Sequence, residues 1–191
     1  MKVIGINGSA RKDGNTAIII GKVFSVLEKA GIETELIQLA GKQIRGCKAC
    51  NACFKNKDKK CAISNDIVNE CIAKMSAADA IILGSPVYFT DITASLKALI
   101  ERAGYVSMAN GYLFKHKVAA GVTAVRRGGA IHAFDTINHF LHWNQMFLVG
   151  STYWNMVHGR DIGEVENDAE GIANMQNLGE NMAMLLRKLH G

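Results

Sequence analysis

Residues 3–16 have the sequence VIGINGSARKDGNT, in which a short apolar run leads directly into a loop of small and polar residues. The run at 3–7 has the composition of a buried strand, and beyond the loop Ile19, Val23 and Leu27 fall on one helical face. A buried strand, a short loop and an amphipathic helix form the first half of a βαβ unit. The stretch therefore predicts a parallel sheet covered by helices.

The same alternation continues along the chain. Further strand-like runs, each separated from the next by a helical or loop segment, occur at 33–38, 80–84, 118–123 and 146–149. Five strands alternating with helices predict an α/β fold, a doubly wound five-stranded parallel sheet with helices on both faces. At 191 residues the chain has the length of one such domain, which we expect to span 1–191.

Composition argues against several classes of partner. No apolar stretch approaches the length of a membrane span, and the basic residues behind the net charge of +5 do not form a nucleic-acid-binding module. The N-terminus lacks the long apolar segment of a secretory signal, so we expect a cytoplasmic protein in a reducing environment. The sequence thus predicts neither a membrane nor a nucleic-acid partner.

Four of the five cysteines lie in the run GCKACNACFKNKDKKC at 46–61. Their spacing is Cys47-x2-Cys50-x2-Cys53-x7-Cys61. Three thiolates at x2 spacing can converge on one inorganic cluster, and a nearby fourth can complete the ligand set, as in ferredoxin-type ligation. We therefore predict a 4Fe–4S cluster on these cysteines, in a cysteine-rich loop at about 44–65.

Two other interpretations of this loop remain open, a metal-free set of reduced thiols and a four-thiolate zinc site. Zinc usually takes two separated cysteine pairs, and disulfides between x2 neighbours rarely meet the required geometry. The loop also carries Lys55, Lys57, Lys59 and Lys60. These charges are either a solvated surface or an attraction for an acidic cofactor or protein donor. The fifth cysteine, Cys71, lies on an apolar helical face and is expected to be a small buried hydrophobe.

The loop at 8–16, GSARKDGNT, has the features of an anion-binding site. It runs into a predicted helix with Asn15 or Thr16 as N-cap, where free N–H groups favour negative charge, and Arg11 adds a positive charge. It matches neither GxGxxG nor GxxxxGK[ST], so neither a dinucleotide loop nor an NTPase loop is predicted. A bound monophosphate fits this loop, and an ordinary polar connection is the alternative.

Two further loops follow the third and fourth predicted strands. In GSPVYF (84–89) the only proline, Pro86, stiffens a turn, and residues 87–89 offer apolar and aromatic surface for a flat heteroaromatic ring. In RRGG (126–129) two arginines precede two glycines that allow a close backbone approach. Ligands of doubly wound sheets bind beyond the carboxyl ends of the strands, so the three loops are expected to form one site.

Taken together, these segments resemble the NADPH-dependent FMN reductase branch of the flavodoxin-like superfamily, and more narrowly the iron-sulfur flavoprotein family. The resemblance covers essentially the whole chain. It rests on GSxRxxGNT, the cysteine motif, SPVYF, RRGG and the later segments STYWNM and NLGENMA. GSxRxxGNT with SPVY indicates the FMN-binding family, and the cysteine spacing indicates the subfamily.

The resemblance implies a flavodoxin-like fold with one FMN site built from the three loops. Its phosphate contacts would come from Ser9, Arg11, Asn15 and Thr16. Its isoalloxazine contacts would come from Pro86, Val87, Tyr88 and Phe89, with Arg127, Gly128 and Gly129 closing the third side. Flavin chemistry needs no catalytic side chain, so none is predicted.

The resulting hypothesis is an FMN-containing redox protein with a 4Fe–4S cluster. It would pass electrons from a ferredoxin-like donor or NAD(P)H to small acceptors such as oxygen, peroxide or quinones. The alternatives are a metal-free NAD(P)H-dependent reductase of FMN, quinones or nitroaromatics, and a non-catalytic flavodoxin-type electron shuttle. Flavodoxins proper are usually acidic and need no cysteine group, so the charge of +5 and the cysteine loop argue against the shuttle.

Aromatic residues in the second half of the chain predict a homo-oligomer, either a homodimer or a homotetramer. Residues 105–114 are expected to follow a helix as an irregular aromatic run, and 151–159, STYWNMVHG, adds further aromatics. Such residues are enriched at interface cores, although both stretches could fold back on their own chain instead. His139 and His142 lack an evident third ligand, so packed or solvated histidines are expected there.

Overall fold

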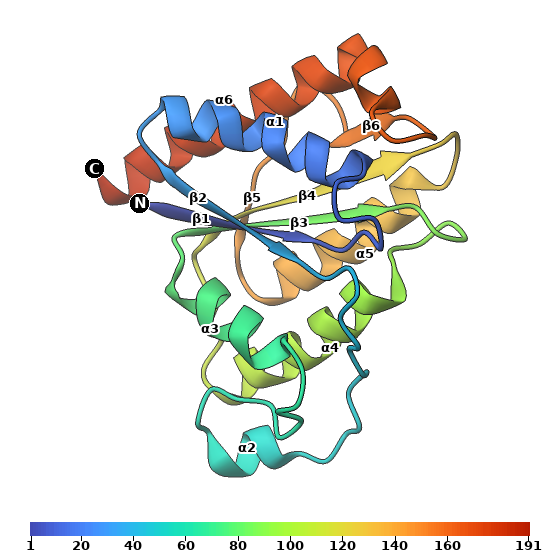
Figure 1. The fold of residues 1–191 in the computed structure, drawn as a ribbon. Helices are drawn as coiled ribbons and strands as arrows, with labels where there is room; N and C mark the ends of the chain where they lie inside the picture. The colour runs from blue at the N-terminus through green and yellow to red at the C-terminus, as the bar shows by residue number, and fades with distance from the viewer.

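A single parallel sheet forms the centre of the computed structural model, which describes residues 1–191 (Figure 1). Its strands are β1 (Lys2–Asn7), β2 (Glu33–Gln38), β3 (Ala80–Pro86), β4 (Val118–Val125), β5 (Phe147–Leu148) and β6 (Met156–His158). Their order is β2-β1-β3-β4-β5, and every pair is parallel. This is the strand order of flavodoxin-like sheets, and it confirms the predicted α/β fold.

The edge beyond β4 is shared by two short strands. The start of β4 pairs with β5, at Val118 and Ala119, while its end pairs with β6 between Thr123 and Val125. The expected strand at 146–149 is therefore only the first part of this edge, because the chain leaves the sheet after β5 and returns at β6. A three-residue strand has too little alternation to be recognised, which is why β6 was not predicted.

Helices cover both faces of the sheet, as expected. One face carries α1 (Asn15–Lys29) and α6 (Ala169–His190), and the other carries α3 (Val68–Ala77), α4 (Ala94–Ala109) and α5 (Ala130–Trp143). Along β1, Ile4 and Ile6 belong to the core under α3, α4 and α5, while Val3 belongs to the core under α1 and α6. Because both faces of the sheet are buried, the strand sequences are continuous apolar runs rather than alternating ones.

Helix α4 is longer than the sequence analysis expected. It extends to Ala109, so Tyr105 and Met108 are helical rather than part of an irregular run after a helix. The short helices α2 (Ala52–Asn56) and η1 (Glu164–Asn167) complete the secondary structure. No helix is both long and apolar enough to cross a membrane.

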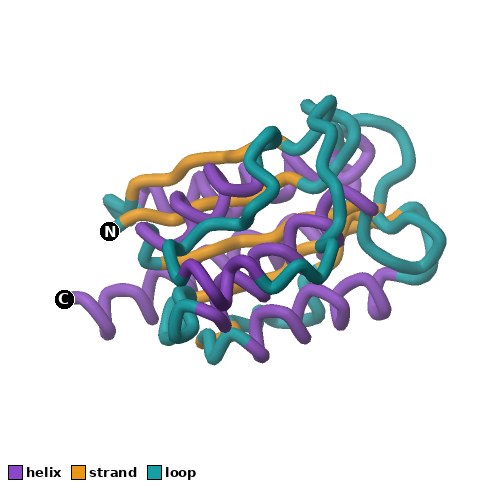
Figure 2. The backbone as a smooth tube through the Cα atoms, turned by 90° about the horizontal axis from the view of Figure 1, so that it is seen from below, coloured by secondary structure: helices purple, strands orange, loops and turns teal.

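The loops that follow β1, β3 and β4 gather at the end of the molecule opposite the two termini (Figures 1 and 2). The cysteine-rich loop lies elsewhere, between β2 and α3, where α2 contacts α4. Cys71 in α3 is wholly buried, as predicted, and burial raises the pKa of its thiol to about 12. The fold therefore sets two regions apart, a group of loops at the sheet end and a cysteine loop beside α4.

Candidate functional site

The three expected loops contact one another at the carboxyl ends of their strands. The backbone N–H of Gly8 donates to the carbonyl of Gly84 at 2.8 Å, and the hydroxyl of Thr93 donates to the carbonyl of Gly8 at 2.7 Å. The N–H of Val87 donates to the carbonyl of Ala124 at 3.1 Å. Hydrogen bonds thus hold the segments after β1, β3 and β4 side by side at this edge, while a single ligand site formed by them stays a prediction.

The loop between β1 and α1 presents unpaired backbone donors. Ser9 is buried, and its hydroxyl oxygen accepts the N–H of Arg11 at 3.0 Å, while the Arg11 side chain is exposed. Helix α1 starts at Asn15 with Gly14 as its N-cap, so the predicted N-cap at Asn15 or Thr16 was wrong. The N–H groups of the first turn have no acceptor within the chain. Such a turn suits a phosphate.

Asn15 and Thr16 have different surroundings. The side-chain amide of Asn15 already has protein partners. Its nitrogen donates to the carbonyl of Asp161 at 2.9 Å, and its oxygen accepts the N–H of Gly163 at 2.8 Å. This side chain ties the segment after β6 to the start of α1, which leaves its backbone N–H for a ligand. The Thr16 hydroxyl is buried and has no hydrogen-bond partner. An unpaired buried hydroxyl is unfavourable, so a phosphate oxygen would satisfy it.

A strained hairpin carries the expected ring-binding residues. Tyr88 and Asp91 exchange backbone hydrogen bonds of 2.8 and 3.0 Å, and the two residues between them, Phe89 and Thr90, have φ of 48° and 67°. Two-residue turns of this kind favour Asn-Gly, because left-handed backbone is unfavourable for other residues. Gly129 supports the turn, since a Cβ at this glycine would lie 2.9 Å from Thr90 Cα. Backbone strain of this kind clusters at ligand-binding sites.

Exposure changes steadily along this hairpin. Pro86 and Val87 are half-buried, Tyr88 is exposed, and the Phe89 side chain is fully exposed. The loop after β4 lies beside them, with Arg127 and Gly128 exposed and open space around the position of a Gly128 Cβ. The residues expected to hold a flat ring therefore lie on neighbouring loops with solvent in front of them.

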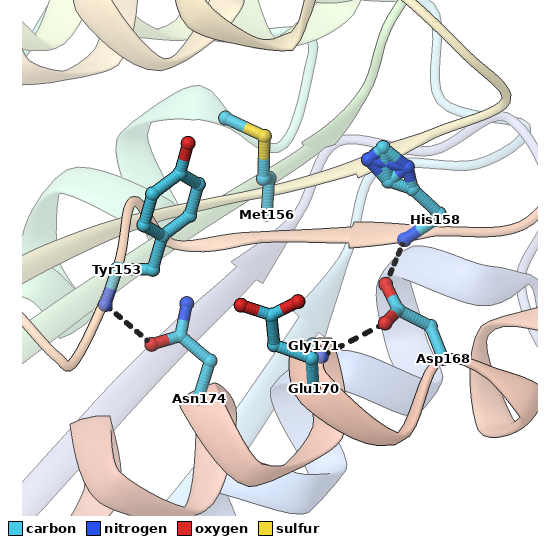
Figure 3. A pocket seen from close by; sticks show the side chains of 7 residues that line it. All are labelled: Tyr153, Met156, His158, Asp168, Glu170, Gly171 and Asn174. Atoms are coloured by element: carbon cyan, nitrogen blue, oxygen red, sulfur yellow. Dashed lines mark hydrogen bonds between the residues drawn. The ribbon is translucent and has the colours of Figure 1, made fainter.

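A cavity of about 500 Å³ lies between β6 and the start of α6 and shares no residue with the three loops (Figure 3). Two of its polar side chains, Asp168 and Asn174, are already engaged. The two carboxylate oxygens of Asp168 accept the N–H groups of Gly171 and His158, at 2.9 and 2.7 Å. The amide oxygen of Asn174 accepts the N–H of Tyr153 at 3.0 Å. These bonds cap α6 and attach it to the segment around β6, so they serve the fold.

A groove of about 550 Å³ runs between α4 and α5. Its walls include Tyr105, Met108 and Trp143, and the indole of Trp143 is 61% exposed. His139 also lines the groove and is exposed, as is His142, in agreement with solvated helix histidines. Aromatic and Met side chains are enriched at interface cores, but Asp91, Lys97 and Glu101 also line this groove, so its composition is mixed.

The four cysteines of the loop line one small cavity of about 20 Å³ against α4. Cys50 is exposed, Cys47 and Cys61 are half-buried, and Cys53 is buried, which raises the pKa of the Cys53 thiol. All are free thiols. Their donor atoms do not converge as a group that would hold a single metal ion. The structure therefore brings the four predicted ligands to a common cavity without drawing them to one point.

Left-handed residues shape the turns of this loop. Ala49, Asn51, Lys57 and Lys59 all have φ between 50° and 61°. The N–H of Ala49 donates to Cys47 Sγ at 3.4 Å. The basic residues of the loop remain exposed, so this region presents positive charge to solvent.

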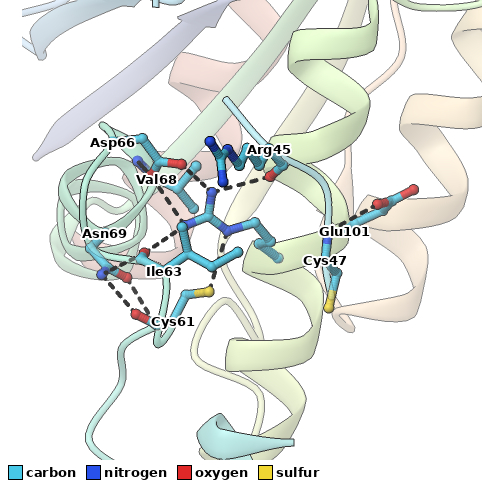
Figure 4. A network of polar contacts seen from close by, with 9 residues as sticks. Arg45, Cys47, Cys61, Ile63, Asp66, Val68, Asn69 and Glu101 are labelled. Atoms are coloured by element: carbon cyan, nitrogen blue, oxygen red, sulfur yellow. Dashed lines mark hydrogen bonds and ion pairs between the residues drawn. The ribbon is translucent and has the colours of Figure 1, made fainter. Parts of the chain in front are cut away.

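Arg102 is the residue of this region that the sequence analysis missed. It lies in α4, its side chain is wholly buried, and it forms an ion pair with Asp66. Its guanidinium also donates to the carbonyls of Arg45 and Ile63, at 3.2 and 2.7 Å, and to Cys61 Sγ at 3.3 Å (Figure 4). Burial lowers the pKa of Arg102, but the bonds to Asp66 and Cys61 raise it by more.

A sequence signal for Arg102 does exist. The apolar stripe of α4 includes Leu96, Leu99 and Ala103, and Arg102 follows Leu99 by three residues on this buried side. A charged residue on a buried helical stripe needs a partner. The partner, Asp66, is far away in sequence, so the sequence alone could flag Arg102 but could not identify its contacts.

Comparison with known sequences identifies the group of proteins to which the chain is similar. A sequence model of the family described as NADPH-dependent FMN reductase matches residues 1–161. An iron-sulfur flavoprotein of Methanocaldococcus jannaschii is 38% identical over 194 residues, which cover 98% of each chain. An iron-sulfur flavoprotein of Methanosarcina thermophila is 36% identical over 152 residues, which cover 78% of each chain.

Solved structures agree on the fold. RosB with bound 8-demethyl-8-formylriboflavin-5'-phosphate matches with a TM-score of 0.79 at 19% identity, covering 99% of this chain and 80% of that chain. A flavodoxin from the Archaea matches with a TM-score of 0.62 at 14% identity, covering 98% and 99%. The fold is flavodoxin-like, and the sequence matches assign it further. The chain belongs to the iron-sulfur flavoproteins, within the NADPH-dependent FMN reductase family.

Proposed function

We propose that this FMN-dependent oxidoreductase carries FMN on its three sheet-end loops and a 4Fe–4S cluster on Cys47, Cys50, Cys53 and Cys61. Electrons would come from a ferredoxin-like donor or NAD(P)H and pass to small acceptors such as oxygen, peroxide or quinones, in the cytoplasm. When bound, FMN would supply two-electron and one-electron chemistry, and the cluster would supply single-electron transfer.

The observation that carries this proposal is that one helix contacts both regions. Helix α4 begins after Thr93, whose hydroxyl donates to the Gly8 carbonyl in the phosphate-binding loop, and further along it provides Arg102 against the cysteine cavity. Thr93 and Arg102 are nine residues apart, about 14 Å along a helix axis. One helix therefore links the two candidate sites within one chain.

The residues at the sheet end fit the phosphate and ring of FMN. The first turn of α1 offers unpaired N–H groups, Thr16 offers an unpaired buried hydroxyl, and Arg11 offers a free positive charge. Residues 86–89 and 127–129 would border the ring. The short loop lacks the fingerprint of a dinucleotide site, which favours FMN over FAD.

The cysteine region fits an anionic cluster better than it fits a single ion. Four thiols share a cavity, a guanidinium N–H donates to one of them, and exposed lysines lie along the same loop. The same positive surface would attract an acidic protein donor. A metal-free reductase remains the second candidate, because Cys47 and Cys61 are also held by hydrogen bonds to the protein alone.

Anaerobic purification tests the proposal directly. We expect iron and acid-labile sulfide in stoichiometric amounts with FMN, little zinc, and a visible spectrum with cluster absorption in addition to flavin. Protein with stoichiometric FMN, no iron or sulfide, and rapid turnover with NAD(P)H would instead establish the metal-free reductase. Electron exchange only with protein partners, without turnover of small acceptors, would support the flavodoxin-type shuttle.

Replacing Arg11 with glutamate should weaken FMN binding about 10- to 100-fold, because a charge-assisted hydrogen bond is lost and a repulsion is added. The measurement is a fluorescence titration of FMN-free protein. Lys12→Glu is the matched control, since Lys12 is an exposed neighbour with the same charge, and it should change the affinity less. Equal affinity in the Arg11 variant and the unmodified protein would remove the phosphate assignment.

We also propose that the working unit is a homodimer or homotetramer. Exposed aromatic side chains lie at two places on the surface. Trp143 lies in the α4–α5 groove, and the rings of Tyr153 and Trp154 pack against each other with centroids 4.5 Å apart. Sedimentation of the holo-protein at low micromolar concentration should give a species of at least twice the 20.7 kDa chain mass. A fully active monomer would be incompatible with this proposal.

A further inference from the structure

The guanidinium of Arg102 has every one of its donors engaged. Nε donates to Cys61 Sγ, Nη1 to the carbonyl of Arg45 and to Asp66 Oδ2, and Nη2 to the carbonyl of Ile63 and to Asp66 Oδ1. A guanidinium has five N–H donors, and five acceptors are present here. A buried arginine with a complete set of partners has a fixed position, because any rotation would break several bonds at once in a buried site.

These acceptors come from both ends of the cysteine loop. Arg45 precedes Cys47, whereas Cys61, Ile63 and Asp66 follow the lysine-rich segment (Figure 4). One side chain of α4 therefore holds the beginning and the end of the loop together. The loop is otherwise attached to α4 by weaker contacts, such as the N–H of Cys47 to Glu101 Oε2 at 3.4 Å.

Cys61 is the ligand that most needs such a contact. The other three cysteines follow one another at x2 spacing, but seven residues separate Cys53 from Cys61. The Asn69 side chain holds the backbone of Cys61. Its amide oxygen accepts the Cys61 N–H at 2.8 Å, and its amide nitrogen donates to the Cys61 carbonyl at 2.9 Å. Arg102 is the side chain that contacts the sulfur itself.

We infer that Arg102 is a positioning residue that fixes Cys61 against the other three cysteines and sets the electrostatic environment of its sulfur. This inference rests on the proposed function. An N–H bond to a ligating sulfur stabilises the more negative, reduced form of a cluster and so raises its reduction potential. Asp66 balances the guanidinium charge and fixes its plane, which aims Nε at the sulfur.

Arginine is required for this role, because lysine lacks the planar fork. An ammonium could keep a charge near Asp66, but it could not bond two carbonyls, a bidentate carboxylate and a sulfur at once. Arg102→Lys is therefore an informative variant. A second variant replaces both members of the pair, Arg102→Met with Asp66→Leu, so that no unpaired charge is buried and folding is preserved.

Three measurements test the inference on the full-length protein. In anaerobic preparations, Arg102→Lys and the double variant should contain less iron per FMN, and the cluster that remains should have a lower midpoint potential. In iron-free protein, trypsin should cleave the loop about tenfold faster than in the unmodified chain, since a charge-assisted bond that closes the loop is lost. The cleavage sites in the loop are Arg45, Lys48, Lys55, Lys57, Lys59 and Lys60.

Asn69→Ala is the comparison for a purely structural effect. It loosens the Cys61 backbone and should accelerate trypsin cleavage, but it leaves the Arg102 bond to the sulfur and should leave the midpoint potential unchanged. Wild-type iron content, potential and trypsin resistance in both Arg102 variants would overturn the inference. If the unmodified protein holds no cluster, the proposed function fails, while the trypsin comparison still decides whether Arg102 positions the loop.

Discussion

Replacing Asp66 with alanine is expected to reduce the free energy of unfolding by about 3–5 kcal/mol, which is the usual effect of leaving a buried charge without its partner. Arg102 would keep its positive charge in a fully buried position and would lose two of its five bonds. Chemical denaturation of the purified protein measures the change.

Two controls separate this effect from a general loss of packing. Glu166→Ala removes the exposed ion pair with Lys22, whose atoms are 2.7 Å apart, and should change the free energy of unfolding by less than about 1 kcal/mol. Arg102→Met with Asp66→Leu should restore most of the stability that Asp66→Ala loses, because no charge remains buried. A loss below about 1 kcal/mol for Asp66→Ala would show that the pair contributes little to stability.

The Arg102–Asp66 ion pair also predicts that the stability of the fold depends on pH. Burial raises the pKa of Asp66, but the hydrogen bonds and charge of Arg102 lower it by more, so the net pKa lies below the ordinary value. A carboxylate with a depressed pKa in the folded state stabilises the fold above the unfolded pKa of about 3.9, and this contribution is lost as the pH falls through the folded pKa. The unmodified protein should therefore lose more stability below about pH 4 than the double variant does.

Cys50→Ser is expected to abolish the proposed cluster, whereas Cys71→Ala should keep it. Cys50 lines the shared cavity, while Cys71 is wholly buried in the core under α3 and α4 and has a pKa near 12. Iron and sulfide analysis of anaerobically purified protein, normalised to FMN, measures both. Loss of iron in Cys71→Ala with retention in Cys50→Ser would place the ligands elsewhere.

Much of the fold could be predicted from local patterns. The runs at 3–7 and 80–84 are apolar because both faces of the sheet are covered, and the ends of those strands place the loops that follow them at one edge. The split of the fifth strand could not be predicted, because β6 has only three residues. The predicted N-cap of α1 was wrong because the side-chain amide of Asn15 bonds to partners that are more than 140 residues away in the chain.

The sequence indicated the loops at the sheet end more fully than it indicated the surroundings of the cysteine loop. Residues 8–16 and 84–89 carry their own chemistry, so their sequence indicated phosphate-binding and ring-binding loops. The strained turn at Phe89 and Thr90 was not foreseen, because nothing local distinguishes it from an ordinary connection. Arg102 depends on contacts with segments 36 to 57 residues away, which no local pattern encodes.

The way in which Arg102 holds the cysteine loop has a consequence for protein engineering. Residues 45–66 leave the sheet after β2 and return before α3, so the loop could be grafted onto another flavodoxin-like protein at the same position. The cysteines alone would not be sufficient for such a graft. The recipient helix would also need an arginine at the position of Arg102, and the helix after the loop would need an asparagine at that of Asn69. A transplant without these two residues would be a flexible, lysine-rich insertion.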